Sequence, residues 1–204
     1  WDVSIEAGVR EGYWGWASCF ADFDNDGNLD LFHVNGMQAS DNAIFSEYWA
    51  DPSRLFISNG DGTFTERSSE VGLGDNGQGR GVVCFDADRD GDIDIFVANN
   101  RQPPAFYVNE GATGNNYLEI VLLGASPNTQ GIGARIVVTA GGKTQTREIR
   151  AGGNYVSQDP AEAHFGLGRE EIASEVLVKW PDGQVTALQA VAANQVVVIR
   201  HPGS

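Results

Sequence analysis

The sequence contains one nine-residue pattern, D-x-D-x-D-G-x-x-D, twice. The first copy spans residues 22–30 and the second spans residues 86–94, so the copies lie 64 residues apart. Side chains at positions 1, 3 and 5 of such a turn converge on one point, and the glycine at position 6 permits the sharp bend. Carboxylates this close would repel one another unless a cation lay between them. The pattern therefore predicts two metal-binding loops.

The kind of metal follows from the ligand atoms. The carbonyl oxygen at position 7 faces inward and the aspartate at position 9 completes the shell, so every ligand is an oxygen atom. Such a shell suits a large, hard ion with flexible geometry, which favours Ca²⁺ over Mg²⁺. We therefore predict two Ca²⁺ ions. The alternative is that both segments are acidic surface turns, because Asp and Gly are common in turns.

The residues around the loops distinguish them from EF-hands. An EF-hand needs a glutamate at position 12 and a helix on each side, but position 12 is His33 in the first copy and Val97 in the second. The flanking segments are short and rich in β-branched and aromatic residues, which indicates strands. We expect these strands at residues 17–21, 31–34, 81–85 and 95–98.

The composition favours an all-β protein with many turns. The chain has 204 residues, of which 41% are hydrophobic and 26 are glycine, and long helical periodicities are few. That length suffices for one large domain or two modest ones. No apolar run approaches the ~20 residues that a membrane-spanning helix needs. The chain begins at Trp1 without a basic and apolar leader, so we expect a processed protein or a fragment.

The negative charge is concentrated in the first part of the chain. The net charge is −15, and residues 1–115 contain 20 acidic and 6 basic residues, whereas residues 116–204 contain 8 and 7. A nucleic-acid partner is disfavoured, because phosphate binding needs a basic face. Open calcium loops work where the ion is abundant, so we expect a secreted, extracellular protein, or a periplasmic one.

The two cysteines, Cys19 and Cys84, lie in equivalent strands of the two copies, one register apart. That offset places them on opposite faces of their own sheets. They could meet if the sheets stack face to face, but two buried thiols are the favoured interpretation. Cysteine positions by themselves leave the pairing open.

A longer repeat surrounds the loops. Residues 55–64 (LFISNGDGTF) follow the first loop, and residues 105–109 (AFYVN) follow the second. Each copy offers about four short strands, which suits one blade of a β-propeller, and blades must stack to bury both faces. The loops and the segments after them resemble the FG-GAP/VCBS repeat of integrin-like β-propellers. We therefore assign residues 1–115 to a partial propeller of such repeats.

This resemblance implies the calcium ligands. The first ion would be held by the side chains of Asp22, Asp24, Asp26 and Asp30 with the carbonyl of Asn28, and the second by those of Asp86, Asp88, Asp90 and Asp94 with the carbonyl of Asp92. A closed propeller has more blades than the roughly two that this chain can form. The open blade edges and faces would then be covered by the C-terminal domain, by other chains, or by further blades of a longer parent.

The C-terminal part, residues 116–201, is organised differently. Short predicted strands separated by glycine-rich turns suggest a small β-sandwich or barrel. Six strands are predicted, at residues 117–123, 134–139, 144–149, 175–180, 185–188 and 195–199. Residues 131–138, 150–153, 164–168 and 178–183 resemble the ASPIC/UnbV domain. Repeats followed by this domain imply secretion, calcium binding and extracellular interaction, and they imply no catalytic residue.

The sequence offers no supported catalytic constellation. His164 is predicted to lie in a turn five residues after Asp159, and the two could pair. No nucleophile signature accompanies them, and no His or Cys spacing resembles a zinc site. His164 is therefore interpreted as a hydrogen-bonding turn residue, and we predict no enzyme activity.

Other residues could form binding surfaces. Trp14 and Trp16 could stack on a sugar, although they more simply fill space between blades. Arg147 and Arg150 are expected on opposite faces of a strand, which argues against a shared basic patch. An aromatic-rich insertion after Asn35 could bind a partner or plug an open blade.

These observations predict a secreted, calcium-stabilised interaction or adhesion module whose partner is an extracellular protein or glycan. One alternative is a structural subunit of an extracellular assembly or filament, which self-associates through its open blade edges. Another is a glycan-binding or glycan-modifying protein with an unrecognised site.

Overall fold

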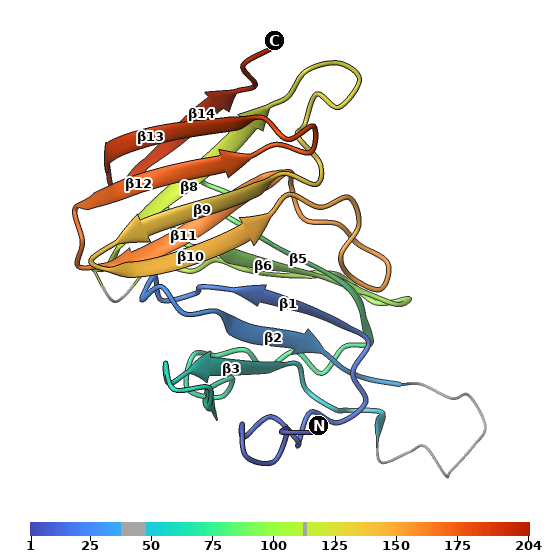
Figure 1. The fold of residues 1–204 in the computed structure, drawn as a ribbon. Coiled ribbons are helices and arrows are strands. Elements are labelled where there is room, and N and C mark those ends of the chain that lie inside the picture. Colours follow the sequence, from blue (N-terminus) through green and yellow to red (C-terminus); the bar gives the residue numbers. More distant parts are fainter. Residues whose placement is uncertain (38–47, 112–113) are drawn as a thin grey trace.

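The computed structural model describes residues 1–37, 48–111 and 114–204. Strands account for nearly all of the regular structure (Figure 1), which confirms the predicted all-β class. No helical segment in these ranges has the length and apolar character of a membrane span. Most of the insertion after Asn35, residues 38–47, lies outside the described residues, and so does its interpretation as a binding loop.

The N-terminal strands form two antiparallel sheets that follow the chain order. The first sheet contains β1 (Ala17–Ala21), β2 (Asp30–Val34), β3 (Arg54–Ser58) and β4 (Phe64–Glu66). The second contains β5 (Gly79–Phe85), β6 (Asp94–Asn99) and β7 (Ala105–Tyr107), so it has three strands rather than the four expected for a blade. Each D-x-D-x-D-G-x-x-D loop connects the first two strands of its sheet. The loops therefore close two equivalent hairpins.

The C-terminal strands form two further sheets, as the predicted sandwich requires. The strands are β8 (Asn116–Leu123), β9 (Arg135–Ala140), β10 (Lys143–Glu148), β11 (Glu162–Gly168), β12 (Ile172–Lys179), β13 (Val185–Ala192) and β14 (Gln195–Arg200). One sheet has the order β10-β9-β12-β13, and the other has the order β11-β8-β14 with β14 parallel to β8. Figure 1 shows these strands stacked above the N-terminal sheets.

The buried apolar side chains gather in two clusters. The C-terminal cluster includes Ile120 of β8, Val138 of β9 and Phe165 of β11, so both sheets of the sandwich contribute to one core. The N-terminal cluster joins Phe32 of the first sheet to Val97 of the second. Alternate residues of strands such as β8 (Leu118, Ile120, Leu122) and β9 (Ile136, Val138, Ala140) face the C-terminal core, which is the period of a half-buried strand. The two N-terminal sheets thus pack on each other as neighbouring blades do, and they form no closed propeller.

The two cysteines are joined, which corrects the expectation of two buried thiols. Cys19 of β1 and Cys84 of β5 form a disulfide with their Cα atoms 6.6 Å apart. The two sheets face each other and bring the cysteine side chains together. The sequence alone left this face-to-face stacking open. Since the bond links strands of different sheets across 65 residues, it ties the two loop-bearing hairpins to each other.

In the C-terminal part, β11 was not predicted, and it matters for the site. β11 carries Gly166 and Gly168, and glycine has a low preference for strands. Glycine inside a strand often marks the close approach of another backbone. A Cβ atom on Gly166 would meet the backbone carbonyl carbon of Asn25 at 2.5 Å and the carboxylate of Asp22 closer still. Residue 166 of this strand must therefore lack a side chain, because the first loop lies against it.

Candidate metal centres

The first loop gathers three carboxylates between β1 and β2. One oxygen from each of Asp22, Asp24 and Asp30 lies within 4.8 Å of the other two. The turn is possible because Gly27 adopts a positive φ of 87°, a backbone conformation that side chains disfavour. The amide N–H of Gly27 donates to Oδ2 of Asp22 at 2.8 Å, which fixes that carboxylate. The loop can thus present three oxygen ligands to one point.

The second loop repeats this geometry between β5 and β6. One oxygen from each of Asp86, Asp88 and Asp94 lies within 4.8 Å of the other two. Gly91 has a positive φ of 98°, and its N–H donates to Oδ2 of Asp86 at 2.9 Å. Positions 1, 3 and 9 of the pattern therefore converge in both copies.

The remaining predicted ligands lie outside these two clusters. Asp26 accepts hydrogen bonds from the backbone N–H and the side-chain amide of Asn28, at 2.6 and 2.7 Å. Asp90 accepts one from the N–H of Asp92 at 2.9 Å. The carbonyl oxygen of the Asn28 side chain accepts a bond from Nζ of Lys143 at 2.6 Å. Positions 5 and 7 thus bond within the loops or to the C-terminal sheet, and their role as ligands stays a prediction.

The electrostatics of the clusters fit a cation. Burial and the neighbouring carboxylates raise the pKa of Asp22 to about 7, and burial raises the pKa of Asp30 to about 7. Burial also raises the pKa of Asp86. Among the described residues, neither these three aspartates nor Asp94 forms an ion pair with an arginine or a lysine. Clustered, buried carboxylates are unfavourable, and a divalent ion would offset their charge. The residues therefore could hold a metal ion.

The first loop lies against the C-terminal sandwich. The N–H of Gly168 in β11 donates to the carbonyl oxygen of Asn25 at 2.8 Å. The side chain of Asn115, just before β8, donates to the carbonyl oxygen of Asp24 at 2.8 Å. These bonds use backbone oxygens of the loop, while the Asp22 carboxylate lies against Gly166 of β11. The loop is thus held to the sandwich through its backbone and packs on it through Asp22.

The second loop contacts the same sandwich through other groups. Nε2 of His164 bonds the carbonyl oxygen of Gly91 at 3.0 Å, so this nitrogen carries the proton. Arg89 forms ion pairs with Glu119 of β8 and Glu162 of β11. His164 lies in β11 rather than in the predicted turn, because the strand pairs with β8. Its hydrogen-bonding role serves the contact between the loop and the sandwich.

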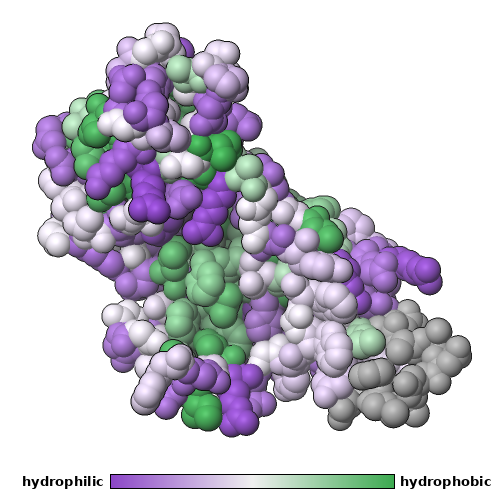
Figure 2. Space-filling view, turned by 45° about the vertical axis from the view of Figure 1, so that its right-hand side comes forward, coloured by the Kyte–Doolittle hydropathy of each residue, from purple (hydrophilic) through white to green (hydrophobic). Residues whose placement is uncertain are grey.

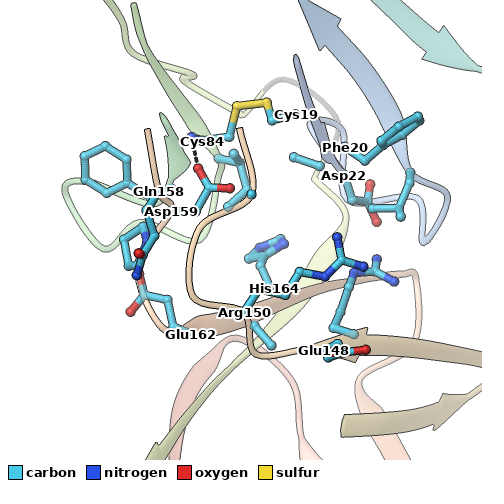
Figure 3. Close-up of a pocket in the computed structure, with 18 of the residues that line it drawn as sticks. Cys19, Phe20, Asp22, Cys84, Glu148, Arg150, Gln158, Asp159, Glu162 and His164 are labelled. Atoms are coloured by element: carbon cyan, nitrogen blue, oxygen red, sulfur yellow. Dashed lines mark hydrogen bonds between the residues drawn. A yellow bond between two sulfur atoms is a disulfide. The ribbon is translucent and has the colours of Figure 1, made fainter. Parts of the chain in front are cut away.

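A cavity of about 520 Å³ lies between the N-terminal strands and the sandwich. Figure 3 shows the disulfide at one side of it and Asp159 beside Cys84, whose N–H donates to Oδ1 of Asp159 at 3.0 Å. Arg147 and Arg150 both line this cavity, which corrects the expectation of opposite strand faces. The reason is that β10 ends at Glu148, so Arg150 lies beyond the strand. Figure 2 shows the hollowed surface between the two parts, with apolar side chains at its base.

The residues considered for catalysis and for sugar stacking have other partners. Asp159 and His164 bond different backbone groups, Cys84 and Gly91, rather than each other. The indole N–H of Trp16 donates to the carbonyl oxygen of Gly36 at 3.0 Å, and this side chain packs against the N-terminal core. Trp16 therefore fills space within the fold, as the simpler interpretation holds.

Sequence reasoning missed the residues that join the loops to their surroundings. Asn25 occupies position 4 of the first loop, a position that the pattern leaves free, and it is buried. Asn109 donates from its side chain to the carbonyl oxygen of Phe23 at 2.8 Å, which links the end of the second copy to the first loop. Asn109 and its counterpart Asn59 occupy equivalent positions in the two copies of the repeat. A single sequence does not show which backbone group such an asparagine bonds.

Comparison with known families agrees with this arrangement. Residues 39–97 match the sequence model of the FG-GAP-like repeat, and residues 124–204 match that of the ASPIC and UnbV domain. The chain thus combines FG-GAP-like repeat sequence with a C-terminal ASPIC and UnbV domain, as the sequence motifs predicted.

Its similar proteins include cartilage acidic protein 1. The chain is 32% identical to that protein from Mus musculus and from Homo sapiens, and 29% identical to that from Xenopus tropicalis. The alignments cover 89% of this chain but only 28%, 27% and 28% of the three relatives. The chain therefore spans little more than a quarter of the length of these relatives.

Proposed function

We propose that this chain is a calcium-stabilised, extracellular interaction module. Residues 1–115 would carry two Ca²⁺ loops on blade-like sheets, and residues 116–201 would form an ASPIC/UnbV-like β-domain packed on them. The observation that carries the proposal is the convergence of three carboxylates in each loop, all within 4.8 Å, at matching positions of two repeats. Oxygen-only donors of this kind favour Ca²⁺.

Each ion would have a structural role. Positions 1, 3, 5 and 9 would supply carboxylates and position 7 a carbonyl, so at most about one ligand place is left for water. A site filled by protein ligands has no open position for a substrate, in contrast to a catalytic metal. The function would then come from rigid surfaces offered to an extracellular protein or glycan, and not from catalysis.

Two observations support the extracellular setting. The disulfide between Cys19 and Cys84 is typical of proteins from oxidising compartments. The chain is also similar to proteins whose name assigns them to cartilage. A periplasmic setting would satisfy the disulfide equally well.

The proposal is tested by calcium titration of the whole chain. Calorimetry should show two bound ions, and saturating Ca²⁺ should raise the melting temperature by several degrees, because an ion that binds only the folded state stabilises it. Asp30→Asn should remove one ion, whereas Glu11→Gln, an exposed charge change outside the loops, should keep both. An identical melting curve in calcium and in chelator would contradict the proposal.

A subunit of a larger assembly is a second candidate function. β7 is an edge strand of its sheet, and Phe96 and Phe106 are 37% and 48% exposed with ring centroids 6.4 Å apart. An exposed apolar face beside an open edge favours contact with another chain. Light scattering in calcium separates the candidates, since a monomer at all concentrations would exclude self-assembly.

A further inference from the structure

The two metal loops meet at one residue, Asn25. This residue is position 4 of the first loop and is only 2% exposed. Its side-chain amide donates to the carbonyl oxygen of Gly91 at 3.1 Å and to Oδ1 of Asp92 at 2.8 Å. Gly91 and Asp92 are positions 6 and 7 of the second loop, where the chain turns and where a backbone ligand is expected. One side chain of the first loop therefore holds the turn of the second.

The direction of this side chain is not imposed by the backbone of the loop. Asn25 has a φ of 58°, and Arg89, at the same position of the second loop, has a φ of 66°. Yet Arg89 extends away from the first loop, to Glu119 and Glu162 of the sandwich. Equivalent backbones thus carry side chains to different partners. The contact from Asn25 to the second loop is a property of this residue and its surroundings.

The surroundings make the contact rigid. The carbonyl oxygen of Asn25 accepts the hydrogen bond from Gly168 of β11, so its backbone is held by the sandwich while its amide holds the second loop. Gly166 packs directly against the backbone of Asn25, because a Cβ atom on Gly166 would collide with Asn25. Asn25 therefore cannot move toward β11. Buried polar groups that lose such bonds carry a large desolvation penalty. A shift of either loop must therefore disturb the other.

We propose that Asn25 couples the two metal sites, so that an ion bound in one loop raises the affinity of the other. The inference rests on the proposed calcium binding of both loops. An ion in the first loop fixes the turn that carries Asn25, and the fixed amide then holds Gly91 and Asp92 in their ion-binding conformation. The second ion binds a loop that is already ordered. Its affinity is higher because less conformational entropy is lost on binding. By linkage, the effect is equal in both directions.

Calorimetric Ca²⁺ titration of the full chain tests this coupling. The wild type should bind two ions with positive cooperativity, the second at least about fivefold more tightly than an independent site would. Asn25→Gly removes the amide and tolerates the positive φ, so it should bind two ions independently. Arg101→Gly is the matched control, since it replaces an exposed residue of positive φ, 58°, outside both loops and should keep the cooperativity.

A second variant protects the test against misfolding of the first. Asp92→Ala removes the acceptor of the Asn25 amide while leaving the backbone carbonyl at position 7. It should lower the cooperativity as well, and the double variant should lose no more than Asn25→Gly alone. Two independent sites in the wild type, or full cooperativity in Asn25→Gly, would overturn the coupling and leave the calcium sites intact. No ion binding in the wild type would instead overturn the proposed function on which the coupling rests.

Discussion

The two metal loops have the same pattern and the same turn, but they lie in different environments. In the first loop Asp22 and Asp30 are buried and Asp24 is half-buried, whereas in the second loop Asp88 is exposed. Burial raises the pKa of Asp22 and of Asp30 to about 7. The first loop is wedged against Gly166 of β11. The second loop meets the sandwich through Gly91, which lies against Tyr117 and bonds His164, and through the side chain of Arg89. Equal ligand patterns therefore do not imply equal sites.

The difference shows which residues do what in such a loop. The aspartates at positions 1, 3 and 9 define the cluster, and they are the same in both copies. The side chain at position 4 has different partners in the two copies: Asn25 reaches the other loop, and Arg89 reaches Glu119 and Glu162. Local geometry follows from the pattern, whereas these partners depend on a residue that the pattern leaves free.

The disulfide is the strongest link between the two hairpins, so its removal should have the largest effect on both loops. Replacing Cys19 and Cys84 by alanine should lower the free energy of unfolding by about 4 kcal/mol, the loop-closure entropy expected for a sequence separation of 65 residues. Denaturant unfolding measures the change. Reduction of the wild type should reproduce it, and unchanged stability after reduction would show that packing alone joins the hairpins.

The position-9 aspartates should be equally important despite their different surroundings. Asp30 accepts backbone hydrogen bonds from Phe23 and Ser58, and Asp94 accepts them from Ala87 and Asn109. Loss of two such charge-assisted bonds, with the ion, should lower the free energy of unfolding by about 3 kcal/mol.

Denaturant unfolding of Asp30→Ala and Asp94→Ala in saturating Ca²⁺ tests this equality. Asp61→Ala is the control, because Asp61 is an exposed aspartate of a turn outside the clusters and its loss should have little effect. A much smaller effect of Asp94→Ala than of Asp30→Ala would mean that burial, and not the shared bonding pattern, sets the contribution of this position.

Gly166 should distinguish the loops, because the atoms nearest to its Cβ position belong to Asp22 and Asn25 of the first loop. Gly166→Ala forces a Cβ atom against Asp22 and Asn25 and should lower the free energy of unfolding by about 2 kcal/mol, as overpacking does. It should also weaken calcium binding at the first loop. Gly153→Ala is the matched control, since nothing lies within 4 Å of its Cβ position. Equal stability of the two variants would mean that the loop is not wedged against β11.

The sequence predicted most of the strands and both carboxylate clusters, because these depend on local patterns. Period-two alternation marks strands such as β9, and closely spaced aspartates around a glycine mark the loops. The failures concern contacts between distant segments. β11 was missed because Gly166 serves a contact with the first loop, and the disulfide was missed because sheet stacking decides it. Asn25 has an ordinary local role, and only its neighbours in space give it a second one.

His164 bonds the second loop, and its effect should be the smallest and should depend on pH. Burial lowers the pKa of His164 to about 4, from an ordinary value of 6.5, and the nearby Arg147 adds to this while Glu162 opposes it. The neutral ring bonds Gly91 through Nε2 and stacks on Tyr117. Its Nδ1 atom is buried without a partner, so the proton of the charged form would be unsatisfied there.

The sign of the pH effect follows from the lowered pKa. As the pH falls below 6.5, the unfolded chain takes up a proton at this histidine before the folded chain does, so the folded state loses stability until the pH approaches 4. Between pH 7 and 5.5 the loss should be about 1 kcal/mol. Denaturant unfolding of the wild type and His164→Gln in saturating Ca²⁺ isolates this contribution, because glutamine does not titrate. Parallel pH profiles for the two proteins would show that the second loop is held to β11 by Arg89 alone.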